Sequence, residues 1–269
     1  MSDPRRTDPA EQVLLVDIGN SNSVFGVLRG GQIEQVFRLA TDRGRTADEV
    51  AALLLPLFAR AGLEPDDTAG MMVSSVVPPL NPMLHQLAEE TFGCHATFVG
   101  PGIRTGMTLR YDNPAEAGAD RIVNVVAARE LYGAPVVVVD FGTATTFDVV
   151  NAAGEYAGGI IAPGIGISAE ALFAQAARLY RVDLRRPDQL IARNTAGAMQ
   201  SGIHFGFLSL VDGILARLEA ELPGLRSVVA TGALAELMIE GSPRIREHNP
   251  RLTLLGLQLI WERNRPRQR

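Results

Sequence analysis

The sequence predicts an α/β protein made of two similar domains in tandem. Residues 13–27, VLLVDIGNSNSVFGV, and residues 136–150, VVVVDFGTATTFDVV, share one pattern: an apolar run, Asp-x-Gly, small polar residues, and a second apolar run. Mixed helical and strand patterns follow each copy, and the copies lie about half the chain apart. A repeat unit of that length indicates a duplicated domain rather than a solenoid of short repeats.

In the first half, the apolar run 13–17 predicts a buried strand, and the residues after it predict a hairpin that turns at Gly30-Gly31. Thr46 and Glu49 have the spacing of a capping box, which predicts a helix ending before Gly62. The pattern then indicates a strand in AGMMVSSVVPP, a helix over about 81–92 and a strand in HATFVG.

The second half opens with a predicted helix from Asn113 to Gly133, because Asn113 can cap it and Pro114 suits the first helical position. Residues 134–139 are typical of a strand buried on both faces, and a second hairpin follows. The remainder is predicted to be mostly helical. Helices are expected at about 168–181, 195–221, 232–240 and 254–264, with a strand in SVVATG. The expected domains are 12–112 and 113–269.

Composition excludes several classes of site. The chain has no lysine, and all 25 basic residues are arginine, so P-loops, the protein-kinase β3 lysine and Schiff-base lysines are excluded. Cys94 is the only cysteine, and the four histidines show no metal-ligand spacing. The formal charge of −5 does not favour nucleic acid. No apolar leader opens the chain, and no charge-free stretch reaches 18 apolar residues, so a cytoplasmic protein without a membrane partner is expected.

The repeated Asp-x-Gly pattern is suited to phosphate binding. A glycine after a buried strand lets the backbone approach a ligand, and the aspartate can hold Mg²⁺ directly or through water. One copy alone favours an ordinary tight turn with a capping aspartate, but two aligned copies favour ligand-binding loops. The pattern resembles the actin-like ATPase and sugar-kinase superfamily. That resemblance implies two tandem ribonuclease-H-like domains with an ATP cleft between them.

Asp120 and Arg121 are the candidate groups for the acceptor. They are adjacent in the second turn of the helix expected from Asn113, after the small residues Gly118 and Ala119. The carboxylate could accept a proton while the guanidinium holds an anionic substrate. A solvated helix face is the alternative for the dipeptide alone, and its setting next to Tyr111 favours a site.

Seven segments, in order along nearly the whole chain, resemble type III pantothenate kinases. They are DIGNSNSVFGV, SSVVPPL, VGPGIRTGMTLRYDNPAEAGADRIVN, DFGTATTFDVV, GGIIAPGI, RNTAGAMQSG and LTLLGLQLIWERN. The Gly-Ala-Asp-Arg and Asp-Phe-Gly-Thr-Ala blocks are the specific ones. The resemblance implies ATP-dependent phosphorylation of pantothenate to 4′-phosphopantothenate, the first step of coenzyme A biosynthesis.

The resemblance also implies roles for individual residues. Asp120 would be the catalytic base, and Asp140 would bind a monovalent cation, K⁺ or NH₄⁺. A homodimer is implied, with an acceptor site that involves the dimer interface. The implied ATP and Mg²⁺ contacts are Asp17, Ile18, Gly19, Asn20, Ser21, Asn22, Ser23, Val24 and Thr143. The implied pantothenate contacts are Tyr111, Gly118, Ala119, Asp120, Arg121 and Thr195.

Four positions depart from the pattern of the family: Ser21 for Thr, Ala233 for Gly, Tyr180 for Pro and Leu255 for Glu. Ala233 would crowd a loop expected near the nucleotide, and Leu255 has no explanation. None of the four removes a proposed catalytic group. Two alternatives stay open: a nucleotide-binding regulator that has lost phosphoryl transfer, and a kinase for another small hydroxylated acid.

Overall fold

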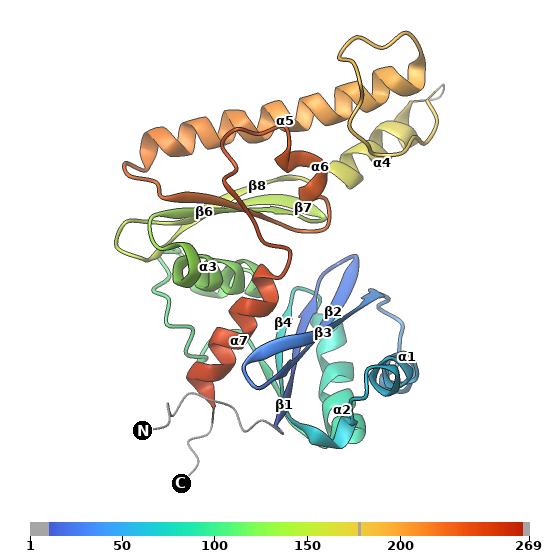
Figure 1. Ribbon diagram of the computed structural model, residues 1–269, viewed down its shortest axis with the longest axis vertical. Coiled ribbons are helices and arrows are strands. Elements are labelled where there is room, and N and C mark those ends of the chain that lie inside the picture. The colour runs from blue at the N-terminus through green and yellow to red at the C-terminus, as the bar shows by residue number, and fades with distance from the viewer. Residues whose placement is uncertain (1–10, 177–178, 266–269) are drawn as a thin grey trace. The chain divides into compact units, whose positions relative to one another are not determined.

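The computed structural model describes residues 11–176 and 179–265; most of the N-terminal stretch on which the leader prediction was based lies outside this range. The chain forms two compact units (Figure 1). Unit 1 comprises the residues through Met107, Asn113–Ala127 and those from Thr253 onward, and unit 2 comprises Thr108–Asp112 and Ala128–Leu252. This division differs from a single boundary between 112 and 113, because the C-terminal helix belongs to unit 1 and a short segment before residue 113 belongs to unit 2.

Unit 1 is built on a five-stranded sheet in the order β3-β2-β1-β4-β5. The first three strands form an antiparallel meander, and β4 and β5 continue the sheet parallel to β1. The strands are β1 (Gln12–Ile18), β2 (Asn22–Arg29), β3 (Gln32–Ala40), β4 (Thr68–Ser75) and β5 (Ala96–Phe98). The hairpin turns at Gly30 and Gly31, whose φ angles of 57° and 81° are left-handed, as the Gly-Gly pair predicts.

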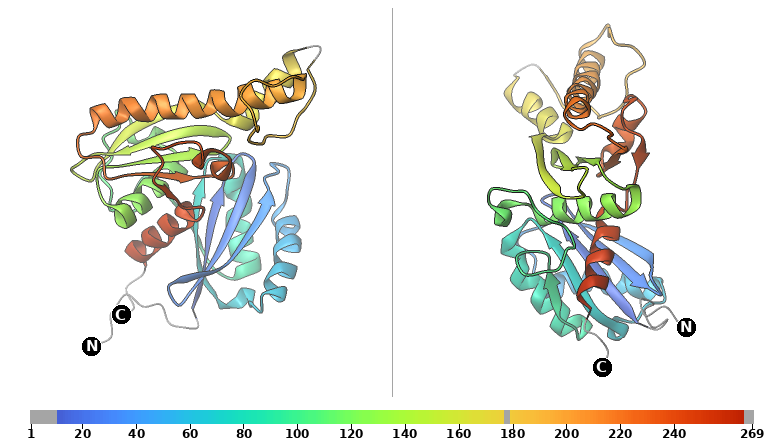
Figure 2. Two further views of the ribbon diagram at one scale, coloured as in Figure 1. Left: turned by 45° about the horizontal axis from the view of Figure 1, so that its top comes forward. Right: turned by 90° about the vertical axis from the view of Figure 1, so that its left-hand side faces the viewer.

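Helices cover both faces of this sheet (Figures 1 and 2). Helices α1 (Ala47–Arg60) and α2 (Asn81–Phe92) bury the main apolar core of unit 1, which includes Val16, Ile18 and Cys94. Burial raises the pKa of Cys94 to about 11, which supports a packing role for this thiol. On the opposite face lies α7 (Leu252–Asn264), where Trp261 packs so closely on Gly70 that a Cβ there would clash.

Unit 2 repeats the topology of unit 1. Its sheet has the order β10-β9-β6-β7-β8: β6, β7 and β8 form an antiparallel meander, while β9 and β10 extend the sheet in parallel from β6. This correspondence confirms the duplicated α/β domain. The strands are β6 (Val136–Phe141), β7 (Ala144–Val150), β8 (Tyr156–Pro163), β9 (Ser227–Thr231) and β10 (Glu247–His248), and the helices are α4 (Ile165–Gln175), α5 (Thr195–Glu221) and α6 (Ala235–Ile239).

The predicted helix from Asn113 is wrong at its start. Asn113 does act as a cap, because its Oδ1 accepts a hydrogen bond from the N–H of Ala115 at 3.3 Å, but it caps only a 3₁₀ turn over Pro114–Glu116. The chain is extended at Ala117, and α3 (Ala119–Tyr132) begins two residues later. Asp120 therefore lies in the first turn of the helix rather than the second.

Other predicted elements differ mainly in their ends. The helix expected at about 168–181 is Ile165–Gln175, the one expected at 232–240 is Ala235–Ile239, and the short strand Glu247–His248 was not expected. The capping box is confirmed: the Thr46 N–H donates to the Glu49 carboxylate at 2.8 Å, and the Glu49 N–H donates to the Thr46 hydroxyl at 3.3 Å. Within the described residues, 3₁₀ turns also occur at Pro65–Asp67 and Pro78–Leu80.

Helix α5 is, by length and composition, apolar enough to cross a membrane. One such helix is weak evidence, since core helices of soluble proteins pass the same test. Its polar side chains are engaged within unit 2: Gln200 donates to the backbone carbonyl of Asp183 at 3.0 Å, and Ser201 donates to that of Leu190 at 2.5 Å. Val211 and Leu215 are buried in the core of the unit. These contacts favour a helix packed on its own domain.

Candidate active site

The loop after β1 is a tight turn fixed from two sides. The Gly19 N–H donates to the carbonyl of Asn22 at 3.0 Å, and the Thr41 hydroxyl donates to the carbonyl of Gly19 at 2.8 Å. The Thr41 N–H donates to the carbonyl of Ser21 at 3.0 Å. Asn20 and Ser21 are exposed at the tip. The loop thus presents small polar groups on a backbone that is already ordered.

Not every residue expected to contact ATP faces outward. Ile18 is buried in the core, and the buried Ser23 hydroxyl is hydrogen-bonded to Thr41 at 2.8 Å, so these two side chains support the loop. Asn22 and Val24 lie at the start of β2. Thr41 itself was missed by the sequence reading. The one feature that could indicate its role is its position directly after β3, the strand that pairs with β2, and β2 follows the loop.

Asp17 lies at the carboxyl end of β1, directly across from Ser74 of the parallel strand β4. The pKa of Asp17 is raised to about 7, mainly by burial and also by the nearby negative charge of Asp120, while the Ser74 hydroxyl and the Arg38 guanidinium act in the opposite direction with smaller effect. Unit 1 thus brings together the two carboxylates that the sequence singled out, from strand β1 and helix α3. Ser74 is a second residue that the sequence reading missed.

Local geometry holds the Asp120 carboxylate. Its Oδ1 accepts a hydrogen bond from the N–H of Arg121 at 2.8 Å. A Cβ on Gly118 would lie 2.6 Å from the same oxygen, so the glycine leaves room for the carboxylate itself. Arg121 is buried, with 7% of its surface exposed. A carboxylate held by a backbone N–H and a buried arginine therefore occupy adjacent positions at the start of α3, which supplies a proton acceptor and an anion-binding group.

The loop after β6 in unit 2 matches the loop after β1. The Gly142 N–H donates to the carbonyl of Ala144 at 3.0 Å, which closes a tight turn behind Asp140. The carbonyl of the exposed Thr143 accepts from the Gly164 N–H at 3.1 Å. Gly232, with φ of 94°, follows the parallel strand β9 and packs so closely on Asp140 that a side chain there would clash. The sequence predicts that this loop lies near the nucleotide, but it points to Ala233, the next residue, and not to Gly232.

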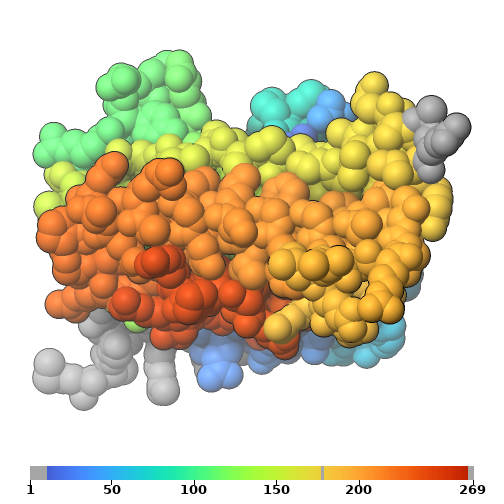
Figure 3. Space-filling view, turned by 90° about the horizontal axis from the view of Figure 1, so that it is seen from above, coloured from blue at the N-terminus to red at the C-terminus, as the bar shows by residue number. Residues whose placement is uncertain are grey.

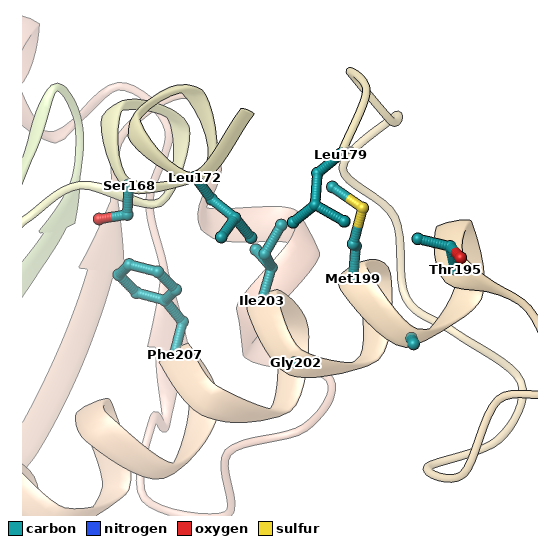
Figure 4. Close-up of a pocket in the computed structure, with 9 residues that line it drawn as sticks. Ser168, Leu172, Leu179, Thr195, Met199, Gly202, Ile203 and Phe207 are labelled. Carbon is teal, nitrogen blue, oxygen red and sulfur yellow. The ribbon is translucent and has the colours of Figure 1, made fainter. Parts of the chain in front are cut away.

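Tyr111 and Thr195 also lie in unit 2. The Tyr111 ring stacks on Tyr156, with centroids 5.6 Å apart and 25° between the planes. Thr195 is the first residue of α5, whose cap Asn194 accepts from the Gly197 N–H at 2.8 Å. The Thr195 side chain lines an apolar groove of about 480 Å³ between α4 and α5 (Figure 4). Ser168, Leu172, Leu179, Ala198, Met199, Gly202, Ile203 and Phe207 complete the lining.

A magnesium site fits this set of residues. No group of three or more His, Cys, Asp or Glu side chains that could hold a metal ion occurs within residues 11–176 and 179–265. Mg²⁺ in phosphoryl-transfer enzymes does not require one, since it is usually bound by one or two carboxylates together with substrate phosphates and water. Asp17, at a strand end beside a tight glycine turn, suits that kind of coordination.

Comparisons with known proteins agree with these features. The family model for type III pantothenate kinase matches residues 13–217. The chain belongs to the type III pantothenate kinase family. It is 49% identical over 267 residues to the type III pantothenate kinase of Koribacter versatilis, covering 96% of this chain and 97% of the relative, and 51% identical over 253 residues to that of Pelobacter propionicus, covering 94% and 100%. This pantothenate kinase family member is therefore an enzyme, a transferase that uses ATP.

Solved structures show the same fold at low identity. The (R)-2-hydroxyglutaryl-CoA dehydratase component A of Acidaminococcus fermentans matches with a TM-score of 0.55 and 13% identity, over 94% of this chain and 97% of that one. The ethanolamine utilization protein EutJ of Carboxydothermus hydrogenoformans matches with a TM-score of 0.55 and 15% identity, over 97% and 92%. At these identities the likeness concerns the fold alone, and it agrees with an α/β fold of two tandem domains.

Proposed function

We propose that the protein transfers the terminal phosphoryl group of ATP to the primary hydroxyl of pantothenate, with Asp120 as the general base. The observation that carries this proposal is the pair of carboxylates in unit 1, Asp17 and Asp120, which come from separate elements and are close enough for the charge of one to raise the pKa of the other. One carboxylate can serve the metal and the other the acceptor alcohol.

In the proposed reaction, Asp120 accepts the hydroxyl proton as the alcohol oxygen forms its bond to the γ-phosphorus, and ADP leaves with the electrons of the broken P–O bond. Asp120 is suited to this step because its carboxylate is fixed by the Arg121 N–H. Mg²⁺, bound at Asp17, would neutralise charge on the phosphate oxygens. Positioning and electrostatics supply most of the acceleration in phosphoryl transfer, and a general base adds roughly 10²–10⁴-fold.

The lysine-free chain must hold the triphosphate in another way. The loop Asp17–Val24 offers backbone N–H groups and the exposed side chains of Asn20 and Ser21, and Thr143 offers its hydroxyl. Arg43 donates to the Asn20 side chain at 3.1 Å and brings a positive charge to the loop tip. Backbone amides and arginine can replace lysine in phosphate binding. We assign ATP contacts to these groups.

For the acceptor, we assign the carboxylate of pantothenate to Arg121. Tyr111, Gly118, Ala119 and Thr195 complete the proposed acceptor site. Burial of Arg121 supports this role, because a guanidinium with little solvent competes well for an anionic partner.

Asp140 is assigned a monovalent cation, K⁺ or NH₄⁺. It lies at a strand end, and a Cβ added to Gly232 or Gly142 would lie 2.4 or 3.6 Å from its Oδ1, so two glycines leave space beside this carboxylate oxygen. A large, weakly hydrated cation suits such an oxygen ligand.

A cytoplasmic homodimer is the proposed form of the enzyme. Unit 2 exposes large apolar side chains on β8 and α4, namely Ile160, Ile161, Ile167 and Leu172. We call these four the β8–α4 apolar segment. Strand β8 is an edge of its sheet, and an uncovered apolar edge favours association. Helix α5 runs along the surface of the unit beside these elements (Figure 3).

The proposed function is tested by incubating the protein with ATP, Mg²⁺, K⁺ and pantothenate and detecting phosphopantothenate by mass spectrometry. Product formation that needs both substrates is expected, and a sodium-only reaction tests the assignment of Asp140. ATP binding without product in any cation would favour the regulator. A better acceptor among related hydroxylated acids would redirect the assignment of the substrate.

A further inference from the structure

The segment Thr108–Asp112 is attached to unit 2 although the residues on either side of it belong to unit 1. It pairs with the start of β8: the Arg110 N–H donates to the Tyr156 carbonyl at 2.8 Å, and the Tyr156 N–H donates to the Thr108 carbonyl at 2.9 Å. Tyr156 thus holds this segment by both of its backbone groups. Tyr111 is the next residue after the paired stretch.

An ion pair reinforces this attachment. The Arg110 guanidinium donates two hydrogen bonds to the Glu155 carboxylate, at 3.0 and 2.7 Å, and Asn151 donates a third at 3.1 Å. The hydrogen bond from Arg110 lowers the pKa of Glu155, which keeps the carboxylate charged. Tyr111 therefore follows a residue, Arg110, that is held twice: by the backbone of Tyr156 and by the side chain of Glu155.

The Tyr156 side chain is itself fixed by a buried polar chain. Its ring is fully buried, and its hydroxyl donates to Oδ1 of Asp148 at 2.7 Å. The Thr146 hydroxyl donates to Oδ2 of the same carboxylate at 2.9 Å, and Asp148 has no exposed surface. A buried carboxylate with both oxygens engaged has one favourable arrangement, so it sets the orientation of the ring that bonds to it.

We propose that Tyr156, oriented by Asp148, is a positioning residue for the pantothenate site: its ring carries Tyr111, which stacks on it with centroids 5.6 Å apart. This inference rests on the proposed function, because it takes Tyr111 to contact the acceptor. Tyr156 is fully buried and acts through Tyr111. The chain Thr146–Asp148–Tyr156–Tyr111 then determines how well the acceptor is held, and it leaves the ATP loop of unit 1 untouched.

The competing interpretation is that Tyr156 only fills the core. A core residue would change stability and would affect both substrates alike. A positioning residue would raise the KM for pantothenate selectively, and its effect would depend on Tyr111. Loss of one hydrogen bond of this kind corresponds to a change of up to about tenfold.

The test uses full-length variants in steady-state kinetics. Tyr156→Phe keeps the ring and removes the hydroxyl, and Tyr156→Leu removes the stack. We expect the KM for pantothenate to rise about tenfold or more in Tyr156→Leu and less in Tyr156→Phe, with an unchanged KM for ATP. Tyr132→Phe is the matched control, because that partly buried tyrosine in the same unit also loses a hydrogen bond, from Asn249 at 3.2 Å, without touching Tyr111. It should keep both KM values.

A double-mutant cycle completes the experiment. In a Tyr111→Ala background, Tyr156→Phe should cause no further rise in the KM for pantothenate, because its effect passes through the missing ring. Independent, multiplying effects would overturn the inference, as would equal losses for both substrates. If Tyr156→Leu does not fold, Tyr156→Phe and the cycle still decide. A wild-type protein that does not phosphorylate pantothenate would instead overturn the proposed function, and a normal Tyr111→Ala variant would overturn the role of Tyr111.

Discussion

A single carboxylate, Asp120, separates the kinase proposal from a protein that only binds nucleotide. Asparagine at this position keeps the size and the hydrogen bond from the Arg121 N–H but cannot accept the proton of the alcohol. We predict that Asp120→Asn lowers kcat about a hundredfold or more, with ATP affinity retained. The measurement is turnover together with calorimetric ATP binding. The exposed Asp112 provides the control substitution Asp112→Asn. Turnover near the wild-type value would remove Asp120 from the role of base.

Asp17 makes stability depend on pH. Its pKa is raised from the model-compound range near 4 to about 7 in the metal-free protein. The native state therefore binds more protons than the unfolded state between these values, so the free energy of unfolding falls as pH rises from about 4 to about 7. The stabilising contribution is complete below pH 4 and lost above pH 7.

Asp17→Asn should abolish that part of the pH dependence. Urea unfolding of both proteins without nucleotide or metal, at about pH 5 and about pH 8, measures it. We expect the variant to gain stability relative to the wild type at the higher pH. An identical pH dependence in the two proteins would show that the carboxylate is not desolvated.

Among the elements, helix α7 depends on a glycine. A Cβ on Gly256 would overlap the backbone carbonyl of Val123 in α3, so the two helices need a bare backbone at their contact. We predict that Gly256→Ala destabilises the protein by about 1–3 kcal/mol despite the better helix propensity of alanine. Thermal unfolding checks this. Gly213→Ala in α5, where a Cβ meets nothing closer than 3.5 Å, is the control and should be neutral or stabilising.

The elements that were predicted correctly are those whose conformation is determined by residues close by in the sequence. The capping box of α1 and the glycine turn of the first hairpin were predicted correctly because each is determined by neighbouring residues. The start of α3 was not, because Asn113 and Pro114 are equally good signals for a 3₁₀ turn. The two can be told apart only if the chain is known to be extended at Ala117, and nothing in the local sequence indicates that.

The candidate site shows the same division. The aspartate and glycine at the ends of β1 and β6 could be identified as candidate ligand-binding residues because an apolar run precedes each pair. Thr41, Ser74, Gly232 and Tyr156 were missed as site residues. Each reaches the site through pairing with a strand or segment distant in sequence, as when Ser74 lies across from Asp17. The pattern of a single sequence does not show which residues of two distant strands lie opposite each other.

At the scale of the whole molecule, the proposed dimer predicts a surface substitution with a clear result. Ile161 is 63% exposed and belongs to the β8–α4 apolar segment. We predict that Ile161→Glu shifts the protein toward monomer, because a charge in an apolar interface loses its solvation. Sedimentation velocity at several concentrations measures the shift. Leu53→Glu, at an exposed apolar position on α1, is the matched control. Unchanged dimer in the Ile161 variant would place the interface elsewhere.

One face of the unit 1 sheet is covered by α7, a helix of 13 residues from the far end of the described chain. Unit 2 is consequently encoded inside unit 1. A ribosome that has finished everything up to Leu252 has produced a first sheet with one side still bare, whereas the inserted domain already has all of its parts. The nascent N-terminal half must therefore wait for residues 253–264 before it can close, and a premature stop after residue 252 would leave Gly26 and Gly70 without the side chains of Leu254 and Trp261 that cover them.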